Sequence, residues 1–147
     1  MPKSFTIRVY GICFNPDGAL LVADEIVKGM QITKFPGGGL EFGEGTRDCL
    51  KREFLEETGQ DIEITEHFYT TDFFIASVFD PKKQVISIYY KVRFVDEPKF
   101  STRNKKFDFP EKKDDVFVFR WLPVTDIRPD EFTFPIDKKV AELLAKR

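Results

Sequence analysis

The feature that most constrains this chain is a run of glycines followed by an uninterrupted helical stretch. Residues 37–39 are all glycine, which predicts a tight loop because glycine adopts positive φ at little cost. Residues 46–58 then contain neither glycine nor proline, and Gly59 is the residue type that commonly ends a helix in the left-handed conformation. The segment from Gly38 to Gln60 is therefore predicted to fold as a glycine loop, a helix and a helix stop.

The predicted helix has a suitable start and one apolar side. Thr46 is a plausible N-cap residue, and Asp48 places a negative charge in the first turn, where the helix dipole favours it. Leu50 and Phe54 stand four residues apart, so both side chains project from the same side of the helix. We expect that side to pack against the core of the protein.

Three glutamates give the helix an unusual polar face. Glu53, Glu56 and Glu57 stand at positions i, i+3 and i+4, where neighbouring Cβ atoms are roughly 5–6 Å apart. Two carboxylates at that spacing repel by about 3 kcal/mol at an effective dielectric constant near 20, so each resists ionising beside its neighbours. A divalent cation that prefers oxygen ligands, such as Mg²⁺, relieves this repulsion. The alternative is a glutamate-rich face that is simply solvated.

The spacing of these residues resembles the signature of the Nudix hydrolases, the Nudix box. In that pattern a glycine, a glutamate, an Arg-Glu pair, a hydrophobic residue, a Glu-Glu pair, a glycine and a final hydrophobic residue stand at fixed distances. Gln60 departs from the pattern, which has an aliphatic residue at this position. The eight matching positions are Gly38, Glu44, Arg52, Glu53, Phe54, Glu56, Glu57 and Gly59.

The resemblance implies that Glu53, Glu56 and Glu57 bind one or more Mg²⁺ or Mn²⁺ ions, and that a backbone carbonyl of Gly37 or Gly38 completes the coordination. The residue types agree with this role, since these ions take oxygen ligands and glycine allows close backbone approach. Such ions neutralise a diphosphate and activate a water molecule for attack on phosphorus. Glu56 or Glu57 is alternatively the base that accepts the proton of this water, and the sequence leaves both roles open.

Two further residues of the box have supporting roles in the family. The equivalent of Arg52 orients the catalytic glutamates, and a guanidinium can bridge carboxylates in a bidentate manner. Glu44 lies in the loop before the helix and is expected to be a partner of Arg52. The alternative for Arg52 is an ordinary surface ion pair with Glu56, four residues further along the helix. Arg52 and Glu44 therefore join the three glutamates as candidate catalytic residues.

The composition bounds the kind of protein that carries this site. The 147 residues suit one compact domain, predicted to span residues 1–147. A hydrophobic fraction of 41% with 17 Phe allows a buried core that is rich in aromatic rings. The net charge of −2 lacks the basic excess of a nucleic-acid binder, so no nucleic-acid polymer is expected as a partner.

The cysteines and the N-terminal residues predict the cellular compartment. Cys13 and Cys49 belong to no metal or redox motif and are expected to be buried free thiols. The first residues lack the apolar run of a signal peptide, and no segment has the length of a membrane span. We therefore expect a cytoplasmic protein with no membrane partner.

Alternating hydrophobic residues outside the box predict a β-rich scaffold. Residues 5–14 and 19–23 flank an Asn-Pro-Asp-Gly turn and are predicted to form a hairpin. Residues 85–95 show the clearest alternation, and residues 116–122 predict another strand. Pro135 and the hydrophobic spacing after it predict a C-terminal helix.

These elements predict an α+β fold with a mixed β-sheet, the box helix and the C-terminal helix, and the Nudix resemblance implies an α/β/α sandwich. Residues 24–31 are predicted to be a loop, and residues 96–115 a long irregular segment of functional importance or mobility. Acids outside the box are candidates for a further ligand, each with a solvated loop charge as the alternative; they are Glu97, Glu111, Asp114 and Asp115. Candidates for stacking on a nucleobase, with core packing as the alternative, are Tyr69, Phe73, Phe74, Tyr89 and Tyr90.

The resemblance implies metal-dependent hydrolysis of a pyrophosphate bond in a nucleoside diphosphate linked to another group X. Nucleoside triphosphates, ADP-ribose and nucleotide sugars are all compatible substrates, and the sequence does not select among them. One alternative is a non-catalytic nucleotide or ADP-ribose sensor on the same fold. Another is a structural domain with an incidental acidic helix. Dimers are common in the family, so a homodimer is compatible with the sequence, although no residue demonstrates it.

Overall fold

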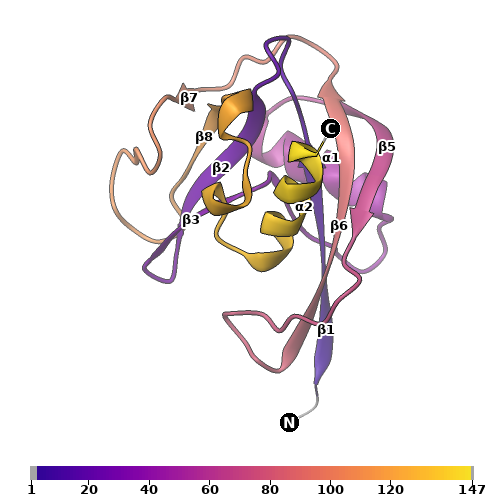
Figure 1. Ribbon diagram of the computed structural model, residues 1–147. Coiled ribbons are helices and arrows are strands. Elements are labelled where there is room, and N and C mark those ends of the chain that lie inside the picture. Colours follow the sequence, from indigo (N-terminus) through magenta and orange to yellow (C-terminus); the bar gives the residue numbers. More distant parts are fainter. Residues whose placement is uncertain (1–2, 147) are drawn as a thin grey trace. The chain divides into compact units, whose positions relative to one another are not determined.

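The computed structural model describes residues 3–146 (Figure 1). These residues form two compact units. The first unit combines the described residues up to Gly11 with Gly37–Pro98, and the second combines Ile12–Pro36 with the residues from Lys99 onward. One four-stranded sheet and one α-helix form the frame of each unit. The helix that carries the three glutamates belongs to the first unit.

The first unit is built on a sheet with the strand order β4-β1-β6-β5. Strand β4 lies at an edge, antiparallel to β1, in a register that places Gly38 opposite Val9. Strands β5 and β6 are antiparallel neighbours. The glycine segment therefore continues the sheet beside the middle of β1. The bounds are Ser4–Ile12 for β1, Gly37–Gly39 for β4, Ile62–Thr70 for β5 and Lys83–Phe94 for β6.

The three glycines form a strand instead of the predicted loop. Gly37 has the expected positive φ, 144°, whereas Gly38 and Gly39 do not. A Cβ atom on Gly37 would overlap the backbone oxygen of Val9. Glycine is thus required at position 37 because β4 pairs closely with β1, and a sharp turn is not the main reason.

Helix α1 spans Thr46–Thr58 and so begins one residue earlier than a Thr46 N-cap predicts. Gly45 occupies the N-cap position in place of Thr46, whose hydroxyl instead lies 2.7 Å from the hydroxyl of Tyr90. Gly59 ends the helix in the left-handed conformation with φ 74°, as predicted. The apolar side is also the predicted one, with Cys49, Leu50 and Phe54 buried.

The second unit contains a sheet with the strand order β3-β2-β8-β7. Strands β2 and β3 form a hairpin whose turn residues, Lys28 and Gly29, have φ values of 50° and 79°. The prediction of a loop over residues 24–31 is therefore wrong, because two strands and a tight turn occupy this segment. The bounds are Leu20–Val27 for β2, Met30–Lys34 for β3, Thr102–Arg103 for β7 and Phe117–Leu122 for β8.

The predicted hairpin of β1 and β2 is wrong as well. Strand β1 pairs with β4 and β6, whereas β2 pairs with β3 and β8. The predicted turn does form, and the Asn15 side chain accepts hydrogen bonds from the backbone N–H groups of Asp17 and Ala19. A bridge between Phe14 and Leu20 continues the pairing only briefly beyond the turn. Turn chemistry thus predicts the reversal of the chain but not the partners of the flanking strands.

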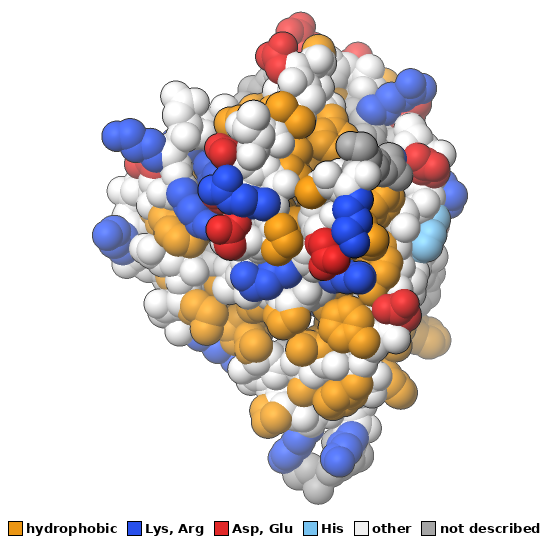
Figure 2. All heavy atoms as spheres, viewed as in Figure 1, with side chains coloured by type: hydrophobic (Ala, Val, Ile, Leu, Met, Phe, Trp, Pro, Cys, Tyr) orange, Lys and Arg blue, Asp and Glu red, His pale blue; other side chains and the backbone are white. Residues whose placement is uncertain are grey.

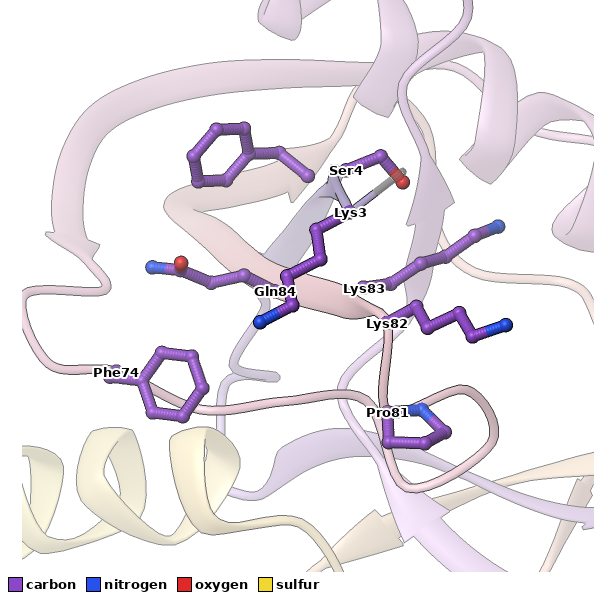
Figure 3. A pocket seen from close by; sticks show the side chains of 8 residues that line it. Lys3, Ser4, Phe74, Pro81, Lys82, Lys83 and Gln84 are labelled. Carbon is purple, nitrogen blue, oxygen red and sulfur yellow. The ribbon is translucent and has the colours of Figure 1, made fainter. Parts of the chain in front are cut away.

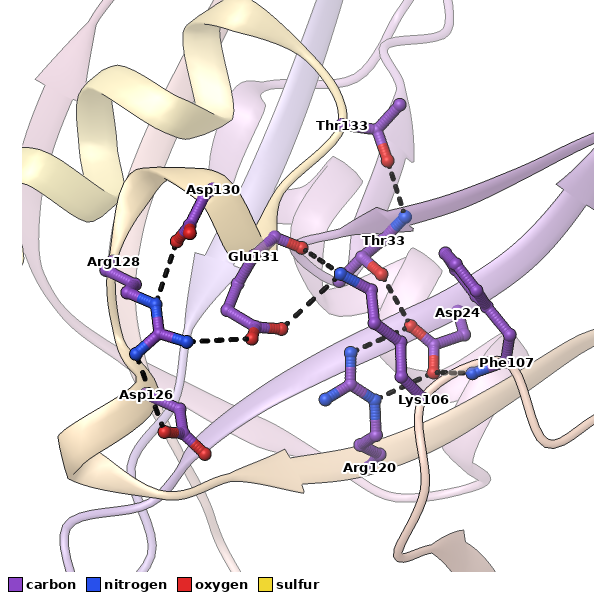
Figure 4. Close-up of polar contacts among 10 residues, drawn as sticks. All are labelled: Asp24, Thr33, Lys106, Phe107, Arg120, Asp126, Arg128, Asp130, Glu131 and Thr133. Carbon is purple, nitrogen blue, oxygen red and sulfur yellow. Dashed lines mark hydrogen bonds and ion pairs between the residues drawn. The ribbon is translucent and has the colours of Figure 1, made fainter.

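A buried ion pair holds the long segment that precedes β8. Asp24, fully buried in β2, accepts hydrogen bonds from Nε and Nη2 of Arg120 at 2.7 and 3.1 Å (Figure 4). Its carboxylate also accepts from the Thr33 hydroxyl at 2.7 Å and from the backbone N–H of Phe107 at 3.1 Å. These donors satisfy a charge that would be costly to bury alone. The contact with Phe107 anchors the segment that the sequence predicts to be irregular.

The same segment contains structure that hydrophobic periodicity does not reveal. Strand β7 pairs in parallel with β8. With two residues, β7 is too short to show an alternating pattern in the sequence. Lys106 reaches the backbone oxygen of Glu131 at 3.0 Å and its carboxylate at 3.4 Å (Figure 4). The segment is therefore fastened to the second unit at several points.

Two short 3₁₀ helices, Val124–Asp126 and Pro129–Glu131, lead to helix α2, Pro135–Ala145. Pro135 occupies the first turn of α2, as the sequence predicts. The helix belongs to the second unit, where the rings of Phe35 and Phe132 also stack at 4.6 Å. Its buried hydrophobic residues are Ile136, Val140, Ala141 and Leu144.

The fold is α+β with the box helix and the C-terminal helix, as predicted. The strands form two four-stranded sheets, whereas one mixed sheet was expected. A single domain over residues 1–147 stays a prediction. Cys13 and Cys49 are free and buried, as expected. Within residues 3–146, no helix is long and apolar enough to cross a membrane.

We predict that Arg120→Met destabilises the protein by about 3–5 kcal/mol, because it leaves the Asp24 carboxylate buried without its charged partner. The matched control is Arg93→Met, which removes an ion pair with Glu63 whose side chains are 69% and 52% exposed. That change is expected to cost less than about 1 kcal/mol. Urea unfolding of both variants measures the difference, and an Arg120→Met loss as small as the control would contradict the prediction.

Candidate active site

Arg52 lies at the centre of the carboxylates on α1. Its Nε and Nη2 atoms donate to the two carboxylate oxygens of Glu44 at 3.0 and 2.8 Å, which is the contact expected from the sequence. Nη2 also donates to the backbone oxygen of Gly39 in β4 at 3.2 Å. A single guanidinium thus connects the loop before the helix, the glycine strand and the second turn of α1.

The Nη1 atom of Arg52 faces two of the three predicted metal ligands. It lies 3.7 Å from Glu53 Oε2 and donates to Glu56 Oε1 and Oε2 at 3.4 and 3.3 Å. The Glu53 side chain is 16% exposed and that of Glu56 is 59% exposed. Arg52 therefore forms the surface ion pair with Glu56 and also contacts Glu44 and Glu53. The expected surface pair and the expected orienting role are both compatible with this geometry.

Glu53 lies directly against the glycine strand. A Cβ atom on Gly38 would overlap the Glu53 carboxylate, with Oε2 2.8 Å away. Since Gly38 does not have positive φ, glycine is needed here for space. The structure thereby brings Glu53 and the backbone of Gly38 together, two of the groups that the resemblance assigns to one cation. Gly37, the other candidate, is buried in the same strand.

Glu57, the third predicted ligand, follows Glu56 on the exposed side of α1. Its side chain is partly exposed, and its Oε1 atom is shielded from solvent. Arg52 forms ion pairs with Glu44, Glu53 and Glu56, so it brings these three carboxylates together. The position of Glu57 on the helix fits a ligand or a base equally well.

Arg52 also keeps the Glu44 carboxyl group ionised. Its hydrogen bonds lower the pKa of Glu44 to about 2, and the backbone N–H of Glu41 acts in the same direction. The same contact raises the pKa of Arg52. Burial raises the pKa of the Cys49 thiol to about 12, although its sulfur lies 3.8 Å from Arg52 Nη2. At neutral pH the Arg52–Glu44 pair is therefore fully charged, and Cys49 is a neutral thiol and not a nucleophile.

The donor types at this site fit a hard divalent cation. Carboxylate oxygens of Glu53, Glu56 and Glu57 and the carbonyl of Gly38 are ligands that Mg²⁺ and Mn²⁺ accept. In the part of the chain that is described, residues 3–146, no three acidic, histidine or cysteine side chains are already gathered as a cation site. Glu53 and Glu56 instead surround the Arg52 guanidinium. Because Glu56 is mostly exposed, its carboxylate can turn towards a cation without disturbing the core.

Sequence reasoning missed Glu41. Its carboxylate lies 3.8 Å from Arg52 Nη1, and its backbone N–H donates to Glu44 Oε1 at 2.9 Å. The loop before α1 is thus closed on itself and held by the same arginine. An acid three residues before Glu44 was the available signal, because a short loop allows the two residues to contact each other.

The candidates outside the box have contacts of their own. Asp114 accepts a hydrogen bond from the backbone N–H of Gly29 at 2.8 Å, and Glu111 pairs with Lys113 at 3.0 Å. His67, the single histidine of the sequence, is exposed. Asp114 and Glu111 thus each have a partner within the second unit.

The chain from residue 4 to residue 144 matches the family model of the NUDIX domain. A NUDIX hydrolase from Nitrosomonas europaea has a similar structure, with 20% identity and a TM-score of 0.68, covering 97% of this chain and 87% of that one. The MutT protein from Methanosarcina mazei Go1 is 18% identical with a TM-score of 0.69, covering 99% and 96%. An ADP-ribose pyrophosphatase from Streptococcus suis is 17% identical with a TM-score of 0.56, covering 95% and 87%. No curated protein matches the sequence.

We predict that the Glu44 carboxyl group titrates with a pKa near 2 in the native protein and that Arg52→Gln moves this pKa up towards its ordinary value of 4.5. Since the folded-state pKa is lowered, the stability from this pair is present above about pH 4.5 and is lost as the pH falls through about 2. NMR titration of the side-chain carboxyl carbon measures the pKa. Lys51→Gln, which removes a neighbouring charge only, is the control, and equal shifts in both variants would contradict the prediction.

We predict that alanine at Gly37 costs more folding stability than alanine at Gly38. Gly37→Ala meets the immovable backbone oxygen of Val9 at positive φ and should cost at least about 1–3 kcal/mol. Gly38→Ala meets the movable end of Glu53, so the protein should lose less than about 1 kcal/mol while the carboxylate is displaced. Urea unfolding and the NMR signal of the Glu53 carboxyl carbon test this. Equal destabilisation by both changes, with an unaltered Glu53 signal, would contradict it.

Proposed function

Because this chain belongs to the Nudix family of pyrophosphohydrolases, we propose that it uses a divalent cation to hydrolyse the pyrophosphate bond of a nucleoside diphosphate linked to another group X. The observation that carries the proposal is the contact of Arg52 with Glu44, Glu53 and Glu56 beside the glycine strand. This arrangement places several oxygen donors side by side, with the Glu53 carboxylate in the space that Gly38 leaves.

Glu53, Glu56 and Glu57 would hold the cation, with the carbonyl of Gly38 or Gly37 as a further ligand. Bound Mg²⁺ or Mn²⁺ neutralises charge on the diphosphate and lowers the pKa of a coordinated water. Glu53 is the best placed of the three, because its carboxylate already lies against Gly38. Glu56 is the most exposed, with 59% of its side chain accessible to solvent.

The protein residues divide the remaining work between positioning and proton transfer. Arg52 is a positioning residue, because its bidentate contact with Glu44 fixes the guanidinium that faces Glu53 and Glu56. Glu56 or Glu57 accepts the proton of the attacking water, leaving hydroxide to attack phosphorus. The bond that breaks is the phosphoanhydride, and its oxygen leaves with the departing phosphate group.

The proposed substrates are small and carry a nucleoside. The similar protein from Streptococcus suis is named an ADP-ribose pyrophosphatase, and this name supports a nucleoside diphosphate joined to a second group. Nucleoside triphosphates, ADP-ribose and nucleotide sugars all contain the bond to be cleaved. We propose this class without choosing among its members.

A non-catalytic nucleotide sensor is the second candidate function. The observation that favours it is that Arg52 pairs with Glu53 and Glu56, so the described residues 3–146 hold no ready cluster of acids for a cation. The complete set of acidic box residues favours catalysis. Turnover with Mg²⁺ separates the two, because a sensor binds nucleotides without consuming them.

We predict that the wild-type protein releases product from at least one of these three substrate types with Mg²⁺ or Mn²⁺ and that EDTA abolishes the activity. Glu57→Gln should lower kcat by about 10²-fold or more, since it removes a cation ligand or the general base. Glu63→Gln, an exposed carboxylate on β5, is the matched control and should keep its activity. Unchanged turnover in Glu57→Gln, or turnover in EDTA, would refute the assignment.

A further inference from the structure

A cavity of about 170 Å³ lies in the first unit where β1 and β6 begin. It shares no lining residue with the box. Its walls come from the start of β1, the start of β6 and the segment that connects β5 to β6 (Figure 3). The lining residues used below are Lys3, Phe5, Phe74, Lys82, Lys83 and Gln84.

Backbone hydrogen bonds hold the walls of the cavity in place. The N–H of Ser4 donates to the backbone oxygen of Lys82 at 3.1 Å, which ties β1 to the start of β6. On the other side, the N–H of Val85 donates to the oxygen of Ile75 at 2.9 Å, and Ala76 forms a bridge with Gln84. The segment with Phe74 is therefore fixed against β6, and the cavity is already formed in the protein alone.

Two aromatic rings border this cavity without contributing to the core. Phe5 is 65% exposed and Phe74 is 72% exposed. Around the start of β1, where Figure 1 marks the N-terminus, Figure 2 shows hydrophobic side chains open to solvent close to basic ones. Exposed rings add little to folding stability, but they offer flat faces on which another ring can stack.

Three lysines add a local positive charge to a protein whose net charge is −2. Within the described residues 3–146, Lys3, Lys82 and Lys83 form no ion pair with an acidic side chain. In Figure 3 the Lys3 side chain extends towards Gln84 and Phe74, whereas Lys82 and Lys83 extend to the other side. Of the three, Lys3 therefore places its positive charge beside Phe74 and Gln84, and an anion is the complementary ligand.

We propose that this cavity is a nucleotide-binding site, separate from the box. The base stacks on Phe74 and Phe5, the Gln84 amide donates to and accepts from the edge of the base, and Lys3 at the rim binds phosphate. A cavity of about 170 Å³ is smaller than the roughly 300–1,000 Å³ that enclose a drug-sized ligand. It has room for one ring system, so the phosphates stay at the open rim.

Two sources supply this chemistry, a free nucleotide and the terminal nucleotide of a single strand. The proposal does not depend on hydrolysis at the box, because none of the glutamates of α1 lines the cavity. Binding can therefore be measured in EDTA, where the cation required by the proposed reaction is removed.

The test uses calorimetry to measure the equilibrium binding of AMP to the full chain in EDTA. Phe74→Ala should weaken binding about 5- to 100-fold, which is the loss expected from removing one stacked ring. Lys3→Gln should weaken it less and reduce its dependence on salt. Phe42→Ala is the matched control, because Phe42 is a fully exposed phenylalanine of the same unit that does not line the cavity. Adenosine and inorganic phosphate should each bind more weakly than AMP.

A 5′-phosphorylated oligonucleotide distinguishes the sources. Tighter binding than AMP, lost in Phe74→Ala, supports the end of a strand, and weaker binding supports a free nucleotide. The proposal is overturned if AMP does not bind at millimolar concentration, or if Phe42→Ala weakens binding as much as Phe74→Ala. It is also overturned if Glu57→Gln abolishes binding while Phe74→Ala does not, since the nucleotide would then occupy the box.

Discussion

The contact between the Arg52 guanidinium and the surrounding carboxylates is the interaction on which the rest of the site depends. One planar cation donates to both oxygens of Glu44, to the backbone of Gly39 and to Glu56, and lies near Glu53. Without a cation at this point, the acids of the loop and helix would repel one another. The fork geometry of arginine also fixes directions, which the point charge of a lysine does not.

The glycine strand β4 provides space for the Glu53 carboxylate, and the same strand also binds Arg52. The edge strand β4 approaches β1 closely enough that Gly37 has no room for a side chain, and Gly38 leaves room for the end of Glu53. Arg52 then binds the next residue of the same strand, Gly39. Helix, loop and strand are thus joined around a small region that is rich in oxygen atoms, which is what a hard divalent cation and a diphosphate require.

The sequence predicted the elements whose causes are local. The helix α1 and its end at Gly59 follow from short-range rules, whereas the contact of Arg52 with Glu44 was implied by the Nudix resemblance. It failed where distant residues decide the outcome. The polar residues from Asp24 onward favoured a loop. Arg120, 96 positions away, instead stabilises the Asp24 carboxylate inside a buried strand. The sequence also could not predict the partners of β1 and β2, because pairing between distant strands leaves no local pattern.

The most direct measurement of the central claim is the position of Mn²⁺ in crystals soaked with the ion, located by its anomalous scattering. The account predicts a peak in coordination contact with the carboxylates of Glu53, Glu56 and Glu57 and with the carbonyl of Gly38 or Gly37, with the Glu56 side chain turned away from Arg52. A peak at another site of a catalytically active crystal, with Glu53 and Glu56 still paired to Arg52, would contradict it.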